Sequence, residues 1–201
     1  MSDSTIELTG DINQYFAEIV EEVIDARRVD SSPAVKHYLV ELLADYAKPG
    51  ATHDAPIDAP LTFLLRDALQ ERGAERFESL RRIGDGVLYL LGFFGGSFEG
   101  RGADRGYVLS VGSSAYDHAS QMLCRSGGGQ APDVLRELAT KFERFVAVIG
   151  EVADGMGTGP TLSDGARLKT YERWLVTGSE RLETRLAGWG MVPGCGAQGV
   201  N

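Results

Sequence analysis

The sequence of 201 residues predicts an all-α fold, in which a single domain forms a bundle of about six to seven helices. Apolar residues recur at helical spacing through almost the whole chain, and no interval alternates apolar and polar residues long enough to predict a strand. Segments rich in glycine or proline separate the periodic stretches, which favours antiparallel packing of neighbouring helices. Hydrophobic residues make up 43% of the chain, enough for a core without disulfides or metals.

The first helix is expected over residues 11–28, because Phe16 and Val20 belong to an apolar stripe of helical period. Ser32 is expected to cap the second helix, with Pro33 at its first position. The apolar periodicity and the glycine and proline breaks define the remaining helices in the same way. The helices predicted after the first cover residues 33–48, 61–70, 74–98, 107–124, 132–152 and 164–186.

The ends of the chain are expected to lie outside the bundle. Residues 1–10 are polar and are predicted to form a flexible N-terminus, residues 11–187 the helical domain, and residues 188–201 a flexible glycine-rich tail. The N-terminus has no basic segment followed by an apolar one, which argues against a signal peptide. The two cysteines, Cys124 and Cys195, stand in no metal-binding spacing. A reducing, cytoplasmic location is the prediction.

The charge balance excludes some classes of partner. The chain carries 20 basic and 29 acidic residues, a net charge of −9. No cluster of lysine and arginine is present that would neutralise phosphates, so binding to nucleic acid is not predicted. The longest apolar stretch, residues 87–94, is much shorter than the roughly 20 residues that a membrane span needs. A membrane span is therefore not predicted either.

Glycine is concentrated inside one predicted helix. The chain has 26 glycines, and several of them fall within residues 84–112. A glycine in a helix interior costs about 1 kcal/mol relative to alanine, so close approach of another helix is expected to compensate for it. The expected neighbour is the helix over residues 107–124. The glycines assigned to this close packing are Gly84, Gly92, Gly96 and Gly112.

A carboxylate, Asp85, stands on the same predicted helix between apolar residues. Carboxylates are rarely buried unless they are paired. The first interpretation is an internal ion pair with Arg81, Arg82 or Arg105, which would fix two helices to each other. One alternative is that Asp85 is the acid of a functional site with a perturbed pKa. The other is that its side chain is exposed to solvent.

Residues 83–116 resemble an uncharacterised bacterial all-helical family with a signature close to IGDxSLxxxGFFxxSL, followed by VDxDYYxxMGxxAY. This chain departs from that signature at Val87, Phe98, Gly106, Val108 and Val111. The resemblance implies a shared helical fold and supplies no catalytic residue. The matching residues are Ile83, Gly84, Asp85, Leu88, Gly92, Phe93, Phe94, Ser97, Asp104, Tyr107, Gly112, Ala115 and Tyr116.

No set of residues with established chemistry is apparent in the sequence. His37, His53 and His118 lie in no metal-ligand spacing, so neither a metal nor a cofactor is predicted. The glycine-rich segment 100–106 follows no strand and lacks the phosphate-loop signature. No serine lies in a nucleophile elbow. An enzyme of unknown class is the third hypothesis. It requires four side chains to converge on one cavity: Asp85, Tyr107, Tyr116 and His118.

The leading hypothesis is a non-catalytic cytoplasmic protein that acts through protein–protein interaction, as an adaptor or regulator or by self-association. The candidate surface is the glycine-rich turn after the fourth helix, with Arg101, Asp104 and Arg105. Arg101 and Arg105 are also candidates to hold an anion at the following helix N-terminus.

The alternative hypothesis is a small-molecule binder. An apolar ligand such as haem or a lipid would lie between the fourth and fifth helices. His118 or His37 is a candidate axial ligand for haem. The side chains expected to line this pocket are Tyr89, Phe93, Tyr107 and Tyr116.

Overall fold

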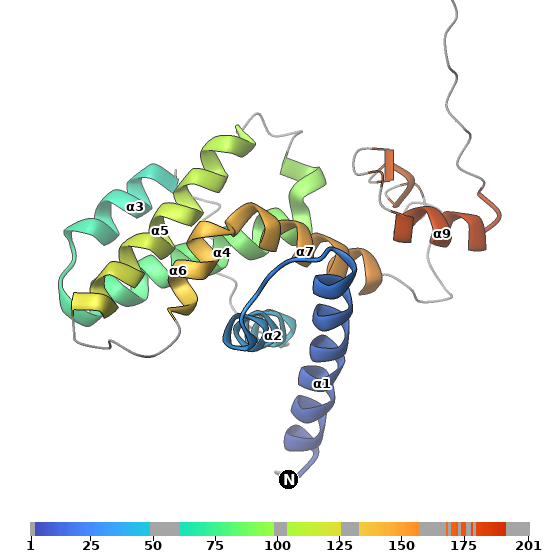
Figure 1. The fold of residues 1–201 in the computed structure, drawn as a ribbon, viewed down its shortest axis with the longest axis horizontal. Coiled ribbons are helices and arrows are strands. Elements are labelled where there is room, and N and C mark those ends of the chain that lie inside the picture. Colours follow the sequence, from blue (N-terminus) through green and yellow to red (C-terminus); the bar gives the residue numbers. More distant parts are fainter. Residues whose placement is uncertain are drawn as a thin grey trace, which may run out of the picture. The chain divides into compact units, whose positions relative to one another are not determined.

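The computed structural model describes residues 3–48, 61–98, 104–125, 133–156, 168, 170–172, 174–175, 178 and 180–191. These residues form helices and no strand, which confirms the predicted all-α bundle (Figure 1). The helices are α1 (Asp3–Ala26), α2 (Pro33–Ala47), α3 (Leu61–Gln70), α4 (Gly73–Phe98), α5 (Arg105–Arg125), α6 (Val134–Thr140), α7 (Phe142–Met156) and α9 (Glu180–Gly188).

The chain divides into two compact units, Met1–Val152 and Ala153–Asn201. The predicted division into residues 1–10, 11–187 and 188–201 stays a prediction. The predicted start of the first helix at residue 11 is wrong, because α1 already begins at Asp3.

In the first unit, α5 packs against both α4 and α6, and α3 packs on α4 and α5 (Figure 1). The helix α1 packs on α2. The interior of this bundle is one cluster of aliphatic and aromatic side chains, to which all the helices from α1 to α7 contribute. The largest fully buried members of this cluster are Phe16, Ile24, Leu39, Leu43, Leu80, Leu88, Leu91, Tyr116, Leu138, Phe145 and Ile149.

The N-terminus of α2 is capped as the sequence predicts. Ser32 has extended backbone angles, its hydroxyl accepts a hydrogen bond from the Val35 N–H at 3.3 Å, and Pro33 is the first helical residue. The hydroxyl satisfies one of the free N–H groups of the first turn, and proline costs nothing there because its position needs no N–H.

The C-terminus of α1 is a Schellman motif that has an arginine where glycine is usual. The Val29 N–H donates to the Ile24 carbonyl oxygen at 3.0 Å, and the Arg28 N–H donates to the Asp25 carbonyl oxygen at 3.1 Å. Arg28 has a φ of 51°, in the left-handed region. An L-residue with a side chain pays about 1 kcal/mol there, which glycine does not pay.

The helix predicted over residues 132–152 is in fact two helices, α6 and α7. Lys141 separates them, with φ −108° and ψ 22°. The Thr140 hydroxyl donates to the Arg136 carbonyl oxygen at 2.8 Å, a bond that competes with the helical ladder and bends helices. The apolar stripe continues through Leu138 and Phe142, so its periodicity gives no sign of the break.

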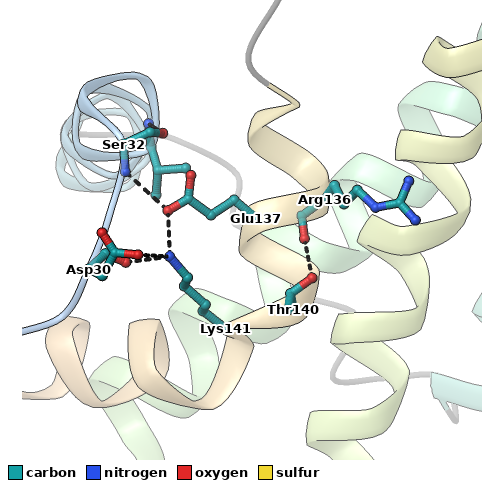
Figure 2. Close-up of polar contacts among 7 residues, drawn as sticks. Asp30, Ser32, Arg136, Glu137, Thr140 and Lys141 are labelled. Carbon is teal, nitrogen blue, oxygen red and sulfur yellow. Dashed lines mark hydrogen bonds and ion pairs between the residues drawn. The ribbon is translucent and has the colours of Figure 1, made fainter.

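Lys141 uses this bend to join α6 to the connection between α1 and α2 (Figure 2). Its Nζ donates to the Asp30 carbonyl oxygen at 2.5 Å and to Glu137 Oε1 at 3.2 Å. Glu137 Oε1 also accepts from the Ser32 N–H at 3.0 Å. Burial alone would raise the pKa of Glu137, but the hydrogen bonds from Ser32 and Lys141 outweigh it and hold the pKa below its usual range.

The second unit contains α9, on which Leu182 and Leu186 are buried. The single helix predicted over residues 164–186 is wrong at Gly178, which has a φ of 61° and is not helical. Its N–H donates to the Trp174 carbonyl oxygen at 2.8 Å. Most of the predicted tail, residues 192–201, lies outside the residues that the structure describes.

Candidate functional site

Asp85 is the centre of a polar cluster that joins three helices. The Tyr38 hydroxyl of α2 and the Tyr116 hydroxyl of α5 both donate to Asp85 Oδ1, at 2.5 and 2.7 Å. The other carboxylate oxygen lies 3.7 Å from a guanidinium nitrogen of Arg81, one helical turn earlier on α4. Both oxygens therefore have partners. Of the three arginines predicted as possible ion-pair partners of Asp85, Arg81 lies next to the carboxylate. The hydrogen bonds to the carboxylate come from the two tyrosines.

Burial is the largest cause of the pKa shifts in this cluster. It raises the pKa of Asp85 above its ordinary 3.8, and the hydrogen bonds from Tyr38 and Tyr116 offset this only in part. Burial, and then the negative charge of Asp85, raise the pKa of Tyr38 and Tyr116 well above 10. The same two causes, with Tyr89, raise the pKa of Tyr46 to about 12. Both tyrosines bonded to Asp85 therefore keep their protons at neutral pH and act as donors.

The cluster is closed to a ligand on the α5 side. Tyr116 is fully buried, and its ring also meets Phe142 edge-on, with ring centroids 5.8 Å apart. Asp85 has 15% of its side chain exposed, next to Arg81. The arrangement is chemically suited to crosslinking α2, α4 and α5, because a buried carboxylate with three partners is satisfied without any further group.

The aromatic residues expected to line one pocket take part in separate contacts. Tyr89 and Phe93 of α4 stack on each other at 4.6 Å between ring centroids, and Tyr46 of α2 stacks on Tyr89 at 4.0 Å. Tyr107 instead shares a hydrogen bond with the Thr62 hydroxyl of α3. These contacts do not bring Tyr89, Phe93, Tyr107 and Tyr116 together around one space.

At the N-terminus of α5, Asp104 acts as a helix cap. Its Oδ1 accepts from the Gly106 N–H at 3.0 Å, so a carboxylate of the chain itself occupies the place expected for an anion. Arg105 is half-buried in the first turn of α5 and His118 is half-buried further along it. Arg101 lies outside the described residues, so the surface predicted from Arg101, Asp104 and Arg105 stays a prediction.

The glycines of α4 and α5 meet neighbours on different helices. A Cβ at Gly84 would lie 2.5 Å from two ring carbons of Tyr116 on α5, so this glycine does face α5. A Cβ at Gly92 would lie 2.4 Å from Ile149 Cγ2, so Gly92 faces α7 and not α5. One at Gly112 would lie 2.4 Å from Phe142 Cζ on α7 and 2.7 Å from Val87 Cγ1 on α4, so Gly112 faces both of these helices. The side-chain surroundings of Gly96 lie outside the described part of the chain.

A pocket of about 550 Å³ opens at the turn between α3 and α4, beside the C-terminal end of α5. Its apolar wall is Phe77, Met122 and Leu123, and Leu123 is 44% exposed. Two polar atoms of its lining, Glu71 Oε2 and Arg76 Nε, are buried and have no hydrogen-bond partner among the described residues. We call it the turn pocket; its lining is Glu71, Arg72, Gly73, Ala74, Arg76, Phe77, Met122 and Leu123.

Sequence reasoning missed the turn pocket. Its two walls are separated by about 50 positions in the chain, and only the packing of α5 on α3 and α4 brings them together. The available signal was the polar pair Glu71 and Arg76, which flanks Gly73 at a helix boundary. A second pocket lies at the end of α1, beside α7.

Within the described ranges, no three histidine, cysteine, aspartate or glutamate side chains are placed to hold a metal ion. No helix in those ranges is long and apolar enough to cross a membrane. Comparison of the chain with protein-family models, curated proteins and solved structures finds no match. The resemblance of residues 83–116 to a bacterial helical family therefore stays a prediction.

Proposed function

We propose that this is a non-catalytic binding protein that recognises a peptide segment of a partner protein in the turn pocket. The observation that carries the proposal is that two polar atoms of the lining, beside an apolar wall, have no hydrogen-bond partner in the described part of the chain. Arg76 Nε is a donor and Glu71 Oε2 is an acceptor. Leaving such atoms without partners costs about 1–3 kcal/mol each. Both atoms are closed to solvent in the free protein, so a ligand gains the two bonds when the side chains of Glu71 and Arg76 turn toward it.

A peptide segment has the matching chemistry. Each peptide unit carries one acceptor for Arg76 Nε and one donor for Glu71 Oε2. An apolar side chain of the same segment would cover Leu123, next to Phe77 and Met122. A pocket of about 550 Å³ is of the size that holds one or two such side chains. Recognition of this kind needs no catalytic group.

The test is selection of a displayed random-peptide library on the purified full-length chain. Selected peptides are expected to share a large apolar residue. Leu123→Asp should weaken their binding at least tenfold, because it places a charge on the apolar wall, and Arg76→Met should weaken it by removing the donor. Tyr15→Asp is the matched control, because Tyr15 on α1 is also 44% exposed.

Thermal unfolding of each variant separates a loss of binding from a loss of fold. Failure to select any peptide, or equal weakening by Tyr15→Asp and Leu123→Asp, would contradict the proposal.

A further inference from the structure

Three arginines surround a second pocket, of about 490 Å³, where the end of α1 lies beside α7. Arg27 and Arg28 come from the end of α1, and Arg144 comes from the first turn of α7. We call it the arginine pocket; its full lining is Arg27, Arg28, Val29, Glu143, Arg144 and Ala147.

One of these arginines, Arg28, has a backbone conformation that is unfavourable for a residue with a side chain. Arg28 has a φ of 51° at the Schellman position that ends α1. Helix α9 ends with the same pair of hydrogen bonds, and there the equivalent residue is Gly190, with a φ of 74°. The chain thus has glycine at one such end and an arginine at the other, where Arg28 is part of the lining of a pocket. A strained residue at a concave site indicates that its side chain is used.

The lining of the arginine pocket carries more positive than negative side chains. Arg27 pairs with Glu151 at 2.9 Å, which fixes its guanidinium against α7. Arg28 and Arg144 are exposed, and no carboxylate in the described part of the chain forms an ion pair with either of them. Glu143 is the acidic residue of the lining. Two guanidinium groups are therefore available to an anion in a protein whose net charge is −9.

We propose that the arginine pocket binds a small phosphate monoester, with its phosphate between Arg28 and Arg144. A guanidinium offers planar pairs of N–H donors that match phosphate oxygens, and two of them suit a dianion. Val29 and Ala147 provide apolar surface for the organic part of the ester. The pocket volume lies within the roughly 300–1,000 Å³ of small-ligand sites. This proposal does not depend on the turn pocket.

The phosphate-ester proposal is tested by titration calorimetry of the full-length protein. The titrants are phenyl phosphate, inorganic phosphate and chloride, all at constant ionic strength. Phenyl phosphate is expected to bind most tightly, because inorganic phosphate has no apolar part. Arg144→Gln should weaken binding of phenyl phosphate at least tenfold. Arg82→Gln, a change at an exposed arginine of α4 outside the lining, should leave it unchanged.

Two further variants separate binding from folding. Arg28→Gly should raise the melting temperature, because glycine accepts the left-handed conformation, and should still weaken phenyl phosphate at least tenfold. Glu143→Gln should tighten binding several-fold, because it removes a negative charge from the lining.

Binding no stronger than that of chloride would overturn the proposal, as would equal effects of Arg82→Gln and Arg144→Gln. Equal affinities for phenyl phosphate and inorganic phosphate would overturn the assignment to an ester.

Discussion

At the scale of single residues, Asp85 couples stability to pH. Burial raises its pKa in the folded protein above the ordinary 3.8. Its contribution to stability is therefore fully present below pH 3.8 and is lost as the pH rises through the folded pKa, where the carboxylate ionises in a site that disfavours charge. Asp85→Asn keeps an oxygen acceptor for both tyrosine hydroxyls and cannot ionise. The free energy of unfolding of wild type minus that of Asp85→Asn should fall as the pH rises above 3.8.

Urea unfolding at a series of pH values from acid to neutral measures this difference. Glu75→Gln serves as the control, since Glu75 is exposed in the first turn of α4 and does not contribute to the pKa shift of Asp85. Profiles of wild type and Asp85→Asn that stay parallel over the whole range would show that the folded pKa of Asp85 is not raised.

Gly84 makes the close packing of α4 and α5 testable at one position. The Cβ of an alanine there would lie 2.5 Å from the ring of Tyr116, which is fully buried and hydrogen-bonded to Asp85. Because this ring has no free space into which it can move, Gly84→Ala should destabilise the protein by about 1–3 kcal/mol, as overpacked cores do.

Gly106→Ala is the matched control for thermal or urea unfolding. Gly106 is also helical, and its Cβ would meet only Asp104 Oδ1 at an ordinary 3.4 Å. The control should be neutral or stabilising by up to about 1 kcal/mol, because alanine is the better helix former. A Gly84→Ala protein as stable as wild type would remove the steric explanation for this glycine.

At the scale of helices, Glu137 holds the bend between α6 and α7 to the start of α2. Its folded pKa is lowered, so its contribution to stability is present above its ordinary pKa of 4.5 and is lost as the pH falls through the folded pKa. Glu137→Gln should cost about 0.5–1.5 kcal/mol at neutral pH, the range of one hydrogen bond. This cost should shrink as the pH falls below 4.5.

Asp30→Asn is the comparison for that measurement by urea unfolding. Asp30 also pairs with Lys141, but its side chain is 94% exposed, so solvent screening should keep its effect below about 0.5 kcal/mol. An equal loss for both variants at neutral pH, or a loss in Glu137→Gln that does not depend on pH, would argue against this account of the bend.

Helix limits could be predicted where the chain carries its own signal. Ser32 followed by Pro33 marks a helix start through local hydrogen bonding, so the start of α2 was predictable. The break at Lys141 was not, because the apolar stripe continues across it and the bend depends on a hydroxyl bond and distant partners. The first helix was expected to end at residue 28, whereas α1 ends at Ala26. The left-handed residue that follows a helix end is usually glycine, and here it is Arg28, so the sequence carries no such signal.

At the scale of the whole molecule, the sites were less predictable than the fold. A Cβ at Gly84, Gly92 or Gly112 would lie within 2.5 Å of a neighbouring side chain. The sequence indicates such close packing because a glycine inside a helix has a local cost that needs a compensating contact. The partners of the segment over residues 84–112 depend on tertiary packing. Tyr38 lies 47 positions before the carboxylate that it contacts, and the arginine pocket joins Arg28 to Arg144. No periodicity or spacing in a single sequence records such contacts.

The division of the molecule into two units leads to a prediction about folding. In the part of the chain that the structure describes, every member of the hydrophobic core cluster lies at or before Val152. The carboxylate of Asp85, the bend at Lys141 and both pockets also belong to Met1–Val152.

Since cooperative unfolding follows from a shared core, a chain that stops after Met156, the end of α7, should fold alone. The urea midpoint of this fragment, measured by circular dichroism, should match that of the main transition of the full chain. A shorter chain that stops at Thr140 lacks the buried side chains of Phe145 and Ile149 and should not fold. Loss of the cooperative transition in the longer fragment would instead support the single helical domain over residues 11–187 that the sequence predicts.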